Sequence, residues 1–570
     1  MKGQRNLLNR FFRAAALVSA TTFAAPLSAE IDPGAYLAAR HAAMSNDFQG
    51  SARYYTKSLL SDPANPELLE NALTSYLGLG QLSRAAPIAG RLMELGEHSQ
   101  IAAIIMQSDA AGSGNWDSIF NGLEAGQNVS PLVDALVQGW AELGRGDVSA
   151  AMATFDAAIE NPQTRTFAFY HKALALASVG DYEAADVLFT QGDNGQAFSA
   201  RSAIAHAQVL SQLDRNEDAL LMLGRVFGQT RNPGVLALRS KLQNNEMVPY
   251  GLVKTAREGV GEVMFMVSEL LSGDTPDGYT LMYTRAAEHL DPKNTAAILS
   301  SGRLLDSLNQ YDLANETYSR ISQDDPSFVA AELGRVDVLR RAEKHDAAVE
   351  VASNLVRLHP EIPAVHAKLG DAHRRLEQYE EAAGAYTAAL DLFSEADTAR
   401  WLVYYTRAIT NHQLDRWPEA EADFRAALAI NPEQPQVLNY LGYSLVERKE
   451  KLDEAMSMIE KAVASQPNNG AIVDSLGWVL FQLGRYHESV GYMERAASLE
   501  AVDPIITDHL GDVYWSVGRK IEAAFQWNRA LSFEPDEALA ERIRLKLSVG
   551  LDAVLEAEGA EPIKVADDDS

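Results

Sequence analysis

Cysteine is absent from the 570-residue chain. Its absence excludes disulfide bonds and cysteine-ligated metal sites, and it leaves no thiol that could carry the lipid of a lipoprotein anchor. Runs of Val, Ile and Thr at a period of two, which are typical of strands, are also missing, while alanine and leucine abound. We therefore expect an all-α protein.

Positive charge is scarce. The chain has 49 Lys and Arg against 78 Asp and Glu, a net charge of −29. This balance repels phosphates and anionic lipid surfaces, so we expect no nucleic acid partner and no stable membrane anchor. A basic peptide, a basic protein face or a neutral apolar ligand is compatible with it. Alternatively, the acidic surface only keeps a long chain soluble.

Catalytic motifs are missing as well. The sequence has no Gly-x-Ser-x-Gly elbow, and no Gly-Lys pair from which a phosphate-binding loop could be built. His487 is followed four residues later by Gly491, so the second ligand of a zinc helix is lacking. His366 and His373 lie seven residues apart without a third ligand. We expect no enzymatic activity, no cofactor and no metal; the alternative is an unrecognised site within 228–278.

The first 29 residues differ from the rest. Basic residues without any acidic one precede a short apolar stretch at 14–25, and Leu27, Ser28 and Ala29 precede Glu30. This order is typical of a secretory signal peptide, and the apolar stretch is too short to span a membrane. An amphipathic first helix is the alternative. For a Gram-negative source we expect an exported, soluble, periplasmic protein.

One pattern is written three times near the C-terminal end. It reads Asn-Tyr-Leu-Gly-Tyr at 439–443, Asp-Ser-Leu-Gly-Trp at 474–478 and Asp-His-Leu-Gly-Asp at 508–512. Gly442, Gly477 and Gly511 are 35 and 34 residues apart, and each is followed by a small residue, a bulky apolar one and alanine. A 34-residue period of this kind is the signature of the tetratricopeptide repeat (TPR). It predicts a TPR superhelical solenoid of about 14 helix pairs with a C-terminal capping helix.

The repeat register divides the chain into segments. We predict a signal peptide at 1–29, a degenerate TPR-like solenoid at 30–227, an irregular helical junction at 228–292, a regular TPR array at 293–535, a capping helix at 536–558 and a disordered acidic tail at 559–570. The least regular part of the junction, 228–278, is interpreted as a change of curvature or a hinge. The capping helix should bury Leu539, Ile543 and Leu547 and expose a polar side that includes Lys546.

Within each pair the glycine should let the second helix approach closely, and the bulky residue should fill the space beside it. One helix pair cannot bury this surface by itself, so stability should come from the stacking of neighbouring pairs.

Resemblance to TPR folds places three rows of side chains on the concave side, where the first helix of each pair lies. The predicted partner-binding groove comprises, row by row, Tyr405, Asn439, Asp474 and Asp508; Tyr443, Trp478 and Asp512; and Val446, Phe481 and Trp515. Asn and carboxylates can accept from backbone N–H groups or basic side chains, and aromatic rings offer flat apolar pockets. The alternative for the aromatic residues is packing between adjacent first helices.

The segment 438–535 resembles a bacterial family of exported TPR proteins that carry these three motifs in the same order. Members of that family include outer-membrane lipoproteins that act as adaptors for a periplasmic C-terminal processing protease. The present chain lacks the lipid-bearing cysteine. The resemblance implies a non-enzymatic scaffold or adaptor that binds a protein or an extended peptide in the concave groove, in the periplasm. A scaffold for envelope, outer-membrane or polysaccharide export assembly is the alternative.

Overall fold

A computed structural model describes residues 33–192, 199–230, 232–559 and 563, and every regular element in these ranges is an α-helix. The chain forms two compact units, residues 1–351 (unit 1) and 352–570 (unit 2), which are described separately. The division falls inside α20 (His345–Leu358). The predicted all-α class is confirmed.

Unit 1 begins with six helix pairs, followed by a single helix, two further pairs and one more helix that precedes α20. Its helices before α20 are α2 (Pro33–Met44), α3 (Phe48–Leu59), α4 (Pro66–Gly78), α5 (Leu82–Glu94), α6 (Gln100–Ser113), α7 (Trp116–Glu124), α8 (Pro131–Gly144), α9 (Val148–Glu160), α10 (Arg165–Ser178), α11 (Tyr182–Gly192), α12 (Ala200–Gln212), α13 (Asn216–Phe227), α14 (Pro233–Gln243), α15 (Ala256–Leu271), α16 (Asp277–Leu290), α17 (Thr295–Ser307), α18 (Tyr311–Tyr318) and α19 (Phe328–Arg341).

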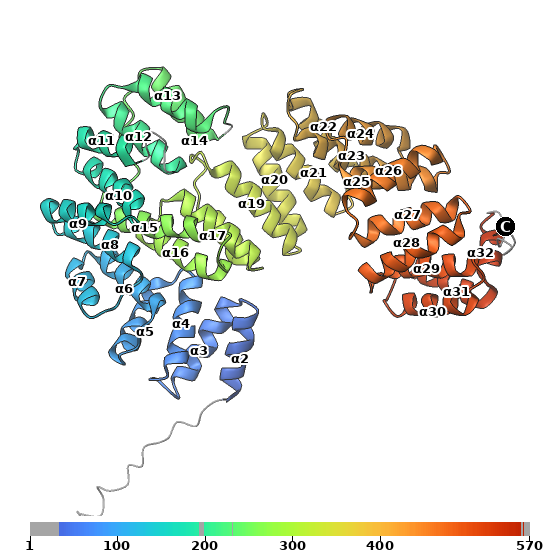
Figure 1. The fold of residues 1–570 in the computed structure, drawn as a ribbon, viewed down its shortest axis with the longest axis horizontal. Helices are drawn as coiled ribbons and strands as arrows, with labels where there is room; N and C mark the ends of the chain where they lie inside the picture. Colours follow the sequence, from blue (N-terminus) through green and yellow to red (C-terminus); the bar gives the residue numbers. More distant parts are fainter. Residues whose placement is uncertain (1–32, 193–198, 231, 560–562, 564–570) are drawn as a thin grey trace, which may run out of the picture. The chain divides into compact units, whose positions relative to one another are not determined.

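The predicted junction at 228–292 is mostly helical, and it folds back onto the preceding pairs. Helix α15 contacts α6, α8 and α10, while α16 contacts α4, α5 and α6. Figure 1 shows α15 and α16 within the arc made by α4 to α12. These two helices therefore cover the inner face of the N-terminal pairs, which neither a change of curvature nor a hinge describes.

Close contacts explain why this hairpin fits. A Cβ on Gly259 would lie 2.2 Å from the Trp140 ring, so only glycine lets α15 approach α8 this closely. On α16, buried Arg285 donates to the carbonyl oxygen of Gly78 at 3.2 Å and pairs with Glu288. A charge buried this deeply needs such partners, because an unpaired one is strongly destabilising.

Unit 2 continues the repeat after α20. Its helices are α21 (Pro363–Arg375), α22 (Tyr379–Leu392), α23 (Arg400–Gln413), α24 (Trp417–Ile430), α25 (Pro435–Glu447), α26 (Leu452–Ser465), α27 (Gly470–Gln482), α28 (Tyr486–Leu499), α29 (Pro504–Ser516), α30 (Lys520–Leu531), α31 (Glu537–Val549) and α32 (Leu551–Ala557). From α21 to α30 each odd-numbered helix packs against the even-numbered one that follows it.

The repeat glycines do what the sequence predicts. A Cβ on Gly442, Gly477 or Gly511 would lie 2.7, 2.4 and 2.4 Å from the bulky side chain of the second helix, which is Ile459, Met493 or Trp527 respectively. These three bulky residues are almost completely buried. The pairs thus interlock at one fixed position, and this position sets the register of the array.

The C-terminal end departs from the prediction in two ways. The expected single capping helix is two helices, because the chain turns at Gly550, whose φ of +86° favours glycine. Lys546, expected on the solvent side of the cap, is instead 1% exposed. The expectation was wrong because Lys546 meets two buried carboxylates of α29.

The predicted signal peptide at 1–29 lies outside the described residues, as does most of the predicted tail at 559–570. Among the helices that the structure describes, none combines the length and the apolar character required to cross a bilayer.

Candidate functional site

The three predicted groove carboxylates are buried rather than presented to solvent. Asp474, Asp508 and Asp512 are 5%, 1% and 1% exposed. Each is already bound to a side chain of a following helix, so none is available to accept a hydrogen bond from a partner. The expectation of an open row failed because neighbouring first helices pack directly on each other, α25 on α27 and α27 on α29.

Asp474 holds the imidazole of His509. Both carboxylate oxygens lie 3.1 Å from His509 Nδ1, and the Trp478 ring stacks on the imidazole at 3.9 Å between centroids. Burial disfavours the imidazolium ion, but the Asp474 carboxylate outweighs burial and the pKa of His509 is raised. Asp474 thus fixes α27 to α29.

Asp508 and Asp512 share Lys546. Lys546 Nζ donates to Asp508 Oδ2 at 2.7 Å and to Asp512 Oδ2 at 2.8 Å. Asp512 also accepts from the indole N–H of Trp527 at 2.9 Å. Burial and then the neighbouring Asp512 raise the pKa of Asp508 to about 6, against the opposing effect of Lys546. This cluster joins α31 to α29 and has no free acceptor directed at a partner.

Most of the predicted aromatic and apolar residues pack inside unit 2. Trp478 and Phe481 stack on each other at 4.8 Å and are 8% and 7% exposed, and Val446 is buried. Half-buried Trp515 donates to Asp552 at 2.9 Å and lies under Lys520. The packing interpretation therefore describes these side chains.

Tyr405, Asn439 and Tyr443 are different, because each is only half-buried. On α23 and α25 the rings of Trp401, Tyr405 and Tyr440 form a continuous run, with centroids 6.5 and 6.4 Å apart. We call these three rings, with Asn439 and Tyr443, the aromatic face. The Oδ1 atom of Asn439 is buried and accepts no hydrogen bond from any described residue.

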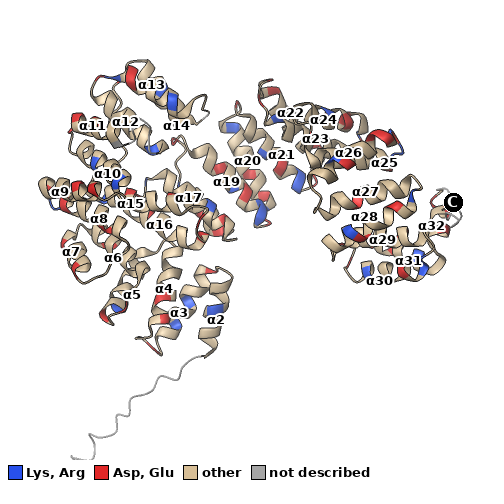
Figure 2. Cartoon of the chain, in the orientation of Figure 1, with Lys and Arg blue, Asp and Glu red and all other residues tan. Residues whose placement is uncertain are grey.

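Positive charge accompanies the aromatic face. Helices α21 and α23 carry five Lys or Arg and one Asp, whereas α22 and α24, the second helices of these pairs, carry six Asp or Glu and one Arg (Figure 2). Arg374, Arg375 and Arg400 form no ion pair with any residue that the structure describes. Burial raises the pKa of Tyr405 and of Tyr440, and the Arg374 guanidinium opposes the shift in both. Arg374 therefore lies within electrostatic range of the Tyr405 and Tyr440 hydroxyls.

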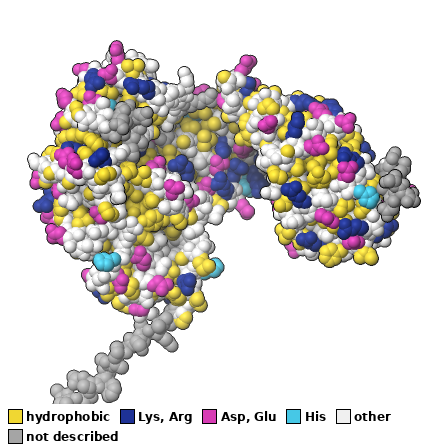
Figure 3. Space-filling view, viewed as in Figure 1, with side chains coloured by type: hydrophobic (Ala, Val, Ile, Leu, Met, Phe, Trp, Pro, Cys, Tyr) yellow, Lys and Arg dark blue, Asp and Glu magenta, His cyan; other side chains and the backbone are white. Residues whose placement is uncertain are grey.

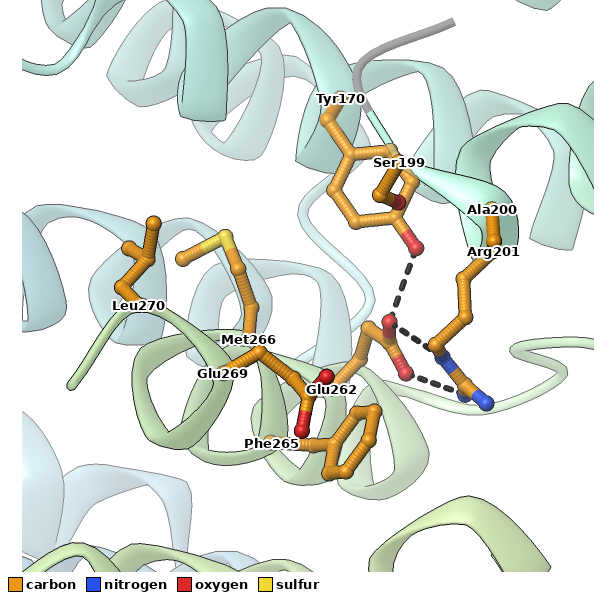
Figure 4. A pocket seen from close by; sticks show the side chains of 9 residues that line it. All are labelled: Tyr170, Ser199, Ala200, Arg201, Glu262, Phe265, Met266, Glu269 and Leu270. Atoms are coloured by element: carbon orange, nitrogen blue, oxygen red, sulfur yellow. Dashed lines mark hydrogen bonds and ion pairs between the residues drawn. The ribbon is translucent and has the colours of Figure 1, made fainter. Parts of the chain in front are cut away.

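A separate cavity lies in unit 1 between α10, the start of α12 and α15. Its volume is about 250 Å³, and Figure 4 shows the side chains around it. Its walls are Tyr170, Ser199, Ala200, Arg201, Glu262, Phe265, Met266, Glu269 and Leu270.

One end of this cavity is a closed network of polar groups. Arg201 donates to Glu262 Oε1 at 2.9 Å and to Oε2 at 2.6 Å, and the Tyr170 hydroxyl donates to Oε1 at 2.8 Å. The Arg201 guanidinium also lies 5.0 Å from the centre of the Phe265 ring. Burial and then Glu262 raise the pKa of Tyr170, so its hydroxyl stays a donor. The network satisfies Glu262, which is 3% exposed.

Sequence reasoning missed Lys546, Arg374 and this network. Glu262 carried a usable signal, since it is a lone carboxylate in the apolar run from Gly259 to Val267 and such a residue needs a buried partner. The partners themselves come from α10 and α12, more than 60 residues away along the chain, and no local pattern identifies them.

The two histidines of α21 do not act together. His366 Nε2 contacts the carbonyl oxygen of Pro360 at 2.8 Å, and His373 Nδ1 contacts Gln378 at 2.7 Å. Each imidazole thus has its own local partner, and within the described residues no group of three or more His, Asp or Glu has the arrangement of a metal site.

Comparison with known proteins agrees with the fold. A family model described as Tetratricopeptide repeat matches residues 299–363, 367–403 and 405–470, and a second one with the same description matches 474–503. The TPR repeat-containing protein PA4667 of Pseudomonas aeruginosa is 35% identical over 81 residues, which span 14% of this chain and 14% of that relative.

The solved structures that match the chain share little sequence with it. A chain of the APC/C hetero-tetramer Cut9–Hcn1 has a TM-score of 0.39 and 15% identity, covering 91% of this chain and 96% of that one. YrrB, described as a TPR protein with an unusual peptide-binding site, has a TM-score of 0.28 and 19% identity, covering 35% and 99%.

Repeats and helix pairs together define the class. Residues 299–503 match the repeat over most of their length, and the helices there interlock through the repeat glycines. The chain therefore carries tetratricopeptide repeats between residues 299 and 503.

Proposed function

We propose that the chain is a non-enzymatic scaffold or adaptor, and that unit 2 binds a partner protein or an extended peptide on the aromatic face of α23 and α25. The observation that carries this proposal is the half-buried run of aromatic rings within electrostatic range of Arg374, which forms no ion pair with any described residue. Aromatic and arginine side chains are the residues that most often dominate binding energy at interfaces. Solenoids of stacked repeats use such extended inner faces for binding.

The charge of this face selects the partner. Arg374, Arg375 and Arg400 lie on the two basic helices of an otherwise acidic protein. A segment that carries carboxylates would gain charge-assisted hydrogen bonds here, while the remaining surface would repel it. We therefore assign an acidic segment to the aromatic face. This partner class differs from the basic or neutral ligands that the net charge of the whole chain suggests, because the local charge of α21 and α23 is positive.

Substitution of all three arginines tests this assignment. The triple variant R374Q/R375Q/R400Q should lose affinity for acidic partner segments by roughly tenfold or more. The matched control R485Q/R495Q/R544Q removes the same charge from α31, from α28 and from the residue that precedes α28. Affinity capture with the purified full chain, followed by mass spectrometry and fluorescence anisotropy with acidic peptides, measures the difference. Equal binding by both triple variants would remove this face from consideration.

The location and the particular partner belong to the same proposal. The order of charged, apolar and small residues at 1–29 supports export to the periplasm. The motifs at 439–443, 474–478 and 508–512 support an adaptor for a periplasmic C-terminal processing protease, with an envelope, outer-membrane or polysaccharide export scaffold as the second candidate. Cell fractionation, with N-terminal sequencing of the mature chain, tests export. Recovery of a protease or of assembly components in the capture experiment separates the two candidates.

A further inference from the structure

We propose that the cavity of unit 1 is an anchor site for one apolar side chain of a partner polypeptide, with a basic residue beside it in the partner that contacts Glu269. This site goes beyond the function proposed for unit 2, because it lies in the other unit and selects the opposite charge. The cavity opens where α15, which covers the inner face of the N-terminal pairs, ends beside α10 and α12.

The size of the cavity favours a side chain over a cofactor. Its volume is about 250 Å³, below the range of roughly 300–1,000 Å³ that is usual for pockets holding drug-sized ligands. An apolar cavity of about 150 Å³ in another protein already accommodates benzene. A leucine, methionine or phenylalanine side chain therefore fits with room to spare, whereas a nucleotide or a larger cofactor does not.

The walls specify an apolar occupant. Phe265, Met266 and Leu270 offer carbon surfaces, and the far end is closed by the Arg201–Glu262–Tyr170 network (Figure 4). Because both oxygens of Glu262 already accept hydrogen bonds, a charged group entering there would be desolvated without gaining a counter-ion. An aliphatic or aromatic group loses nothing by comparison and gains the burial of its apolar surface.

The rim specifies the flanking charge. Arg201 and Glu262 neutralise each other, so Glu269 leaves the cavity with one net negative charge. Glu269 is exposed, and it forms no ion pair with any residue in the described part of the chain. A lysine or arginine next to the apolar anchor can reach this carboxylate, and the chain's net charge of −29 attracts such a segment from a distance.

Access to the cavity is provided by exposed residues. Ala200, Glu269 and Leu270 stand at its edge and are each exposed to solvent. Substitutions at these three positions can therefore block or alter the entrance without disturbing a packed core.

A peptide array with purified full-length protein tests the proposal. The probes are twelve-residue peptides in which a single Leu, Met or Phe is flanked by Lys, with control peptides in which the apolar residue is Ser or the Lys is Glu. Ala200→Trp fills the entrance, Leu270→Glu makes the apolar wall polar, and Glu269→Lys reverses the charge of the rim. The matched controls on exposed positions of α13 are Leu221→Glu and Glu217→Lys.

We expect Leu-Lys, Met-Lys and Phe-Lys peptides to bind, and A200W and L270E each to weaken binding by tenfold or more. E269K should abolish the preference for Lys over Glu in the peptide. L221E and E217K should bind like the unaltered protein, and the melting temperatures of all variants should agree within a few degrees.

Other results overturn the proposal. The proposal fails if no peptide that combines an apolar residue with Lys binds, or if A200W and L270E bind these peptides as well as the unaltered protein does. It also fails if Glu-flanked peptides bind as well as Lys-flanked ones, or if L221E and E217K lose as much affinity as the cavity variants. The triple arginine variant of unit 2 should bind these peptides normally. A failure of the aromatic face is therefore distinguishable from a failure of the cavity, since each site has its own variants and its own class of peptide.

Discussion

Single residues decide how the C-terminal end of unit 2 is built. Lys546 is buried, and it binds two carboxylates, Asp508 and Asp512, that are themselves buried. Like charges this close would otherwise repel, and neither carboxylate has solvent to replace a lost cation. The stability of α29 against α31 therefore depends on one side chain.

Replacing Lys546 with methionine keeps the length of the side chain and removes its charge. We expect K546M to lower the free energy of unfolding by about 3–5 kcal/mol, the range found when one partner of a buried pair is removed. The control is R544M on the same helix, whose salt bridge with Glu537 is exposed and contributes about 0–1 kcal/mol. Urea unfolding followed by circular dichroism compares the two. Similar losses in both would show that the buried cluster contributes little.

The same cluster predicts a dependence on pH. The pKa of Asp508 is raised from 3.8 to about 6 in the folded protein, so between these values the folded state binds more protons than the unfolded state. Its contribution to stability is therefore fully present below about pH 4 and is lost as the pH rises through about 6. The pKa of His509 is also raised from 6.5, and its contribution is likewise lost as the pH rises beyond that value.

Asp508→Asn isolates the first of these effects. As the pH increases from 4 to 7, the unfolding free energy of the variant should rise relative to that of the unaltered protein by on the order of 2 kcal/mol. Urea unfolding at a series of pH values measures both proteins. Parallel stability curves would contradict a raised pKa at Asp508.

At the scale of the helices, the repeat glycines fix the distance between the two members of a pair. Trp527 fills the site beside Gly511, and its indole is held by Asp512, so the ring cannot move aside. A methyl group at Gly511 would overlap it. Gly491 on α28 has no neighbour within 4 Å of the position of a Cβ, and it provides a matched comparison.

We expect Gly511→Ala to destabilise the protein by about 1–3 kcal/mol through overpacking. Gly491→Ala should stabilise it by about 0.5–1 kcal/mol, because alanine loses less backbone entropy in a helix. Thermal unfolding of both variants measures the opposite signs. A loss at Gly511 no larger than the change at Gly491 would show that the pair tolerates a wider spacing.

The helices of the regular array could be predicted because their signals are local. Gly442, Gly477 and Gly511 recur at the repeat period, and each contacts a residue 16 or 17 positions later in the same pair. Contacts between distant parts of the chain have no corresponding pattern in the sequence. The proximity of Gly259 to Trp140, or of Lys546 to Asp508, depends on how helices stack in three dimensions.

The predicted site shows the same contrast. Positions beside the Leu-Gly motif were expected to face a partner, but at Asp474 and Asp508 the next first helix lies against them. Tyr405 and Asn439 occupy positions equivalent to these two, Tyr443 is equivalent to Asp512, and all three stay half-buried. The repeat defines which residues lie on the inner side, and the tightness of stacking, which the period does not encode, decides which of them reach solvent.

At the scale of the whole molecule, the two proposed binding surfaces differ from their surroundings in charge. On the face shown in Figure 3, hydrophobic side chains are interspersed with charges of both signs. The aromatic face of unit 2 is accompanied by arginines that form no ion pair with a described residue. The cavity of unit 1 has a carboxylate at its rim, Glu269, that no described cation neutralises. Two units with opposite local charge could hold two different segments, which is what a scaffold requires.

Each unit has its own buried clusters. Those around Trp140 and Leu73 draw only on residues before position 352, and those around Trp527 and Phe424 only on residues after it. Because cooperativity in unfolding follows contiguous packing, we expect two separate thermal transitions in the full chain.

Substitutions placed in one unit should then move one transition only. K546M should lower the transition of unit 2, and Gly259→Ala, whose new methyl group would overlap the Trp140 ring, should lower that of unit 1. Gly278→Ala on α16 has free space at its Cβ and should leave both unchanged or slightly raised. Differential scanning calorimetry of the three variants resolves the two transitions. If either K546M or G259A shifted both transitions equally, the two units would not unfold independently.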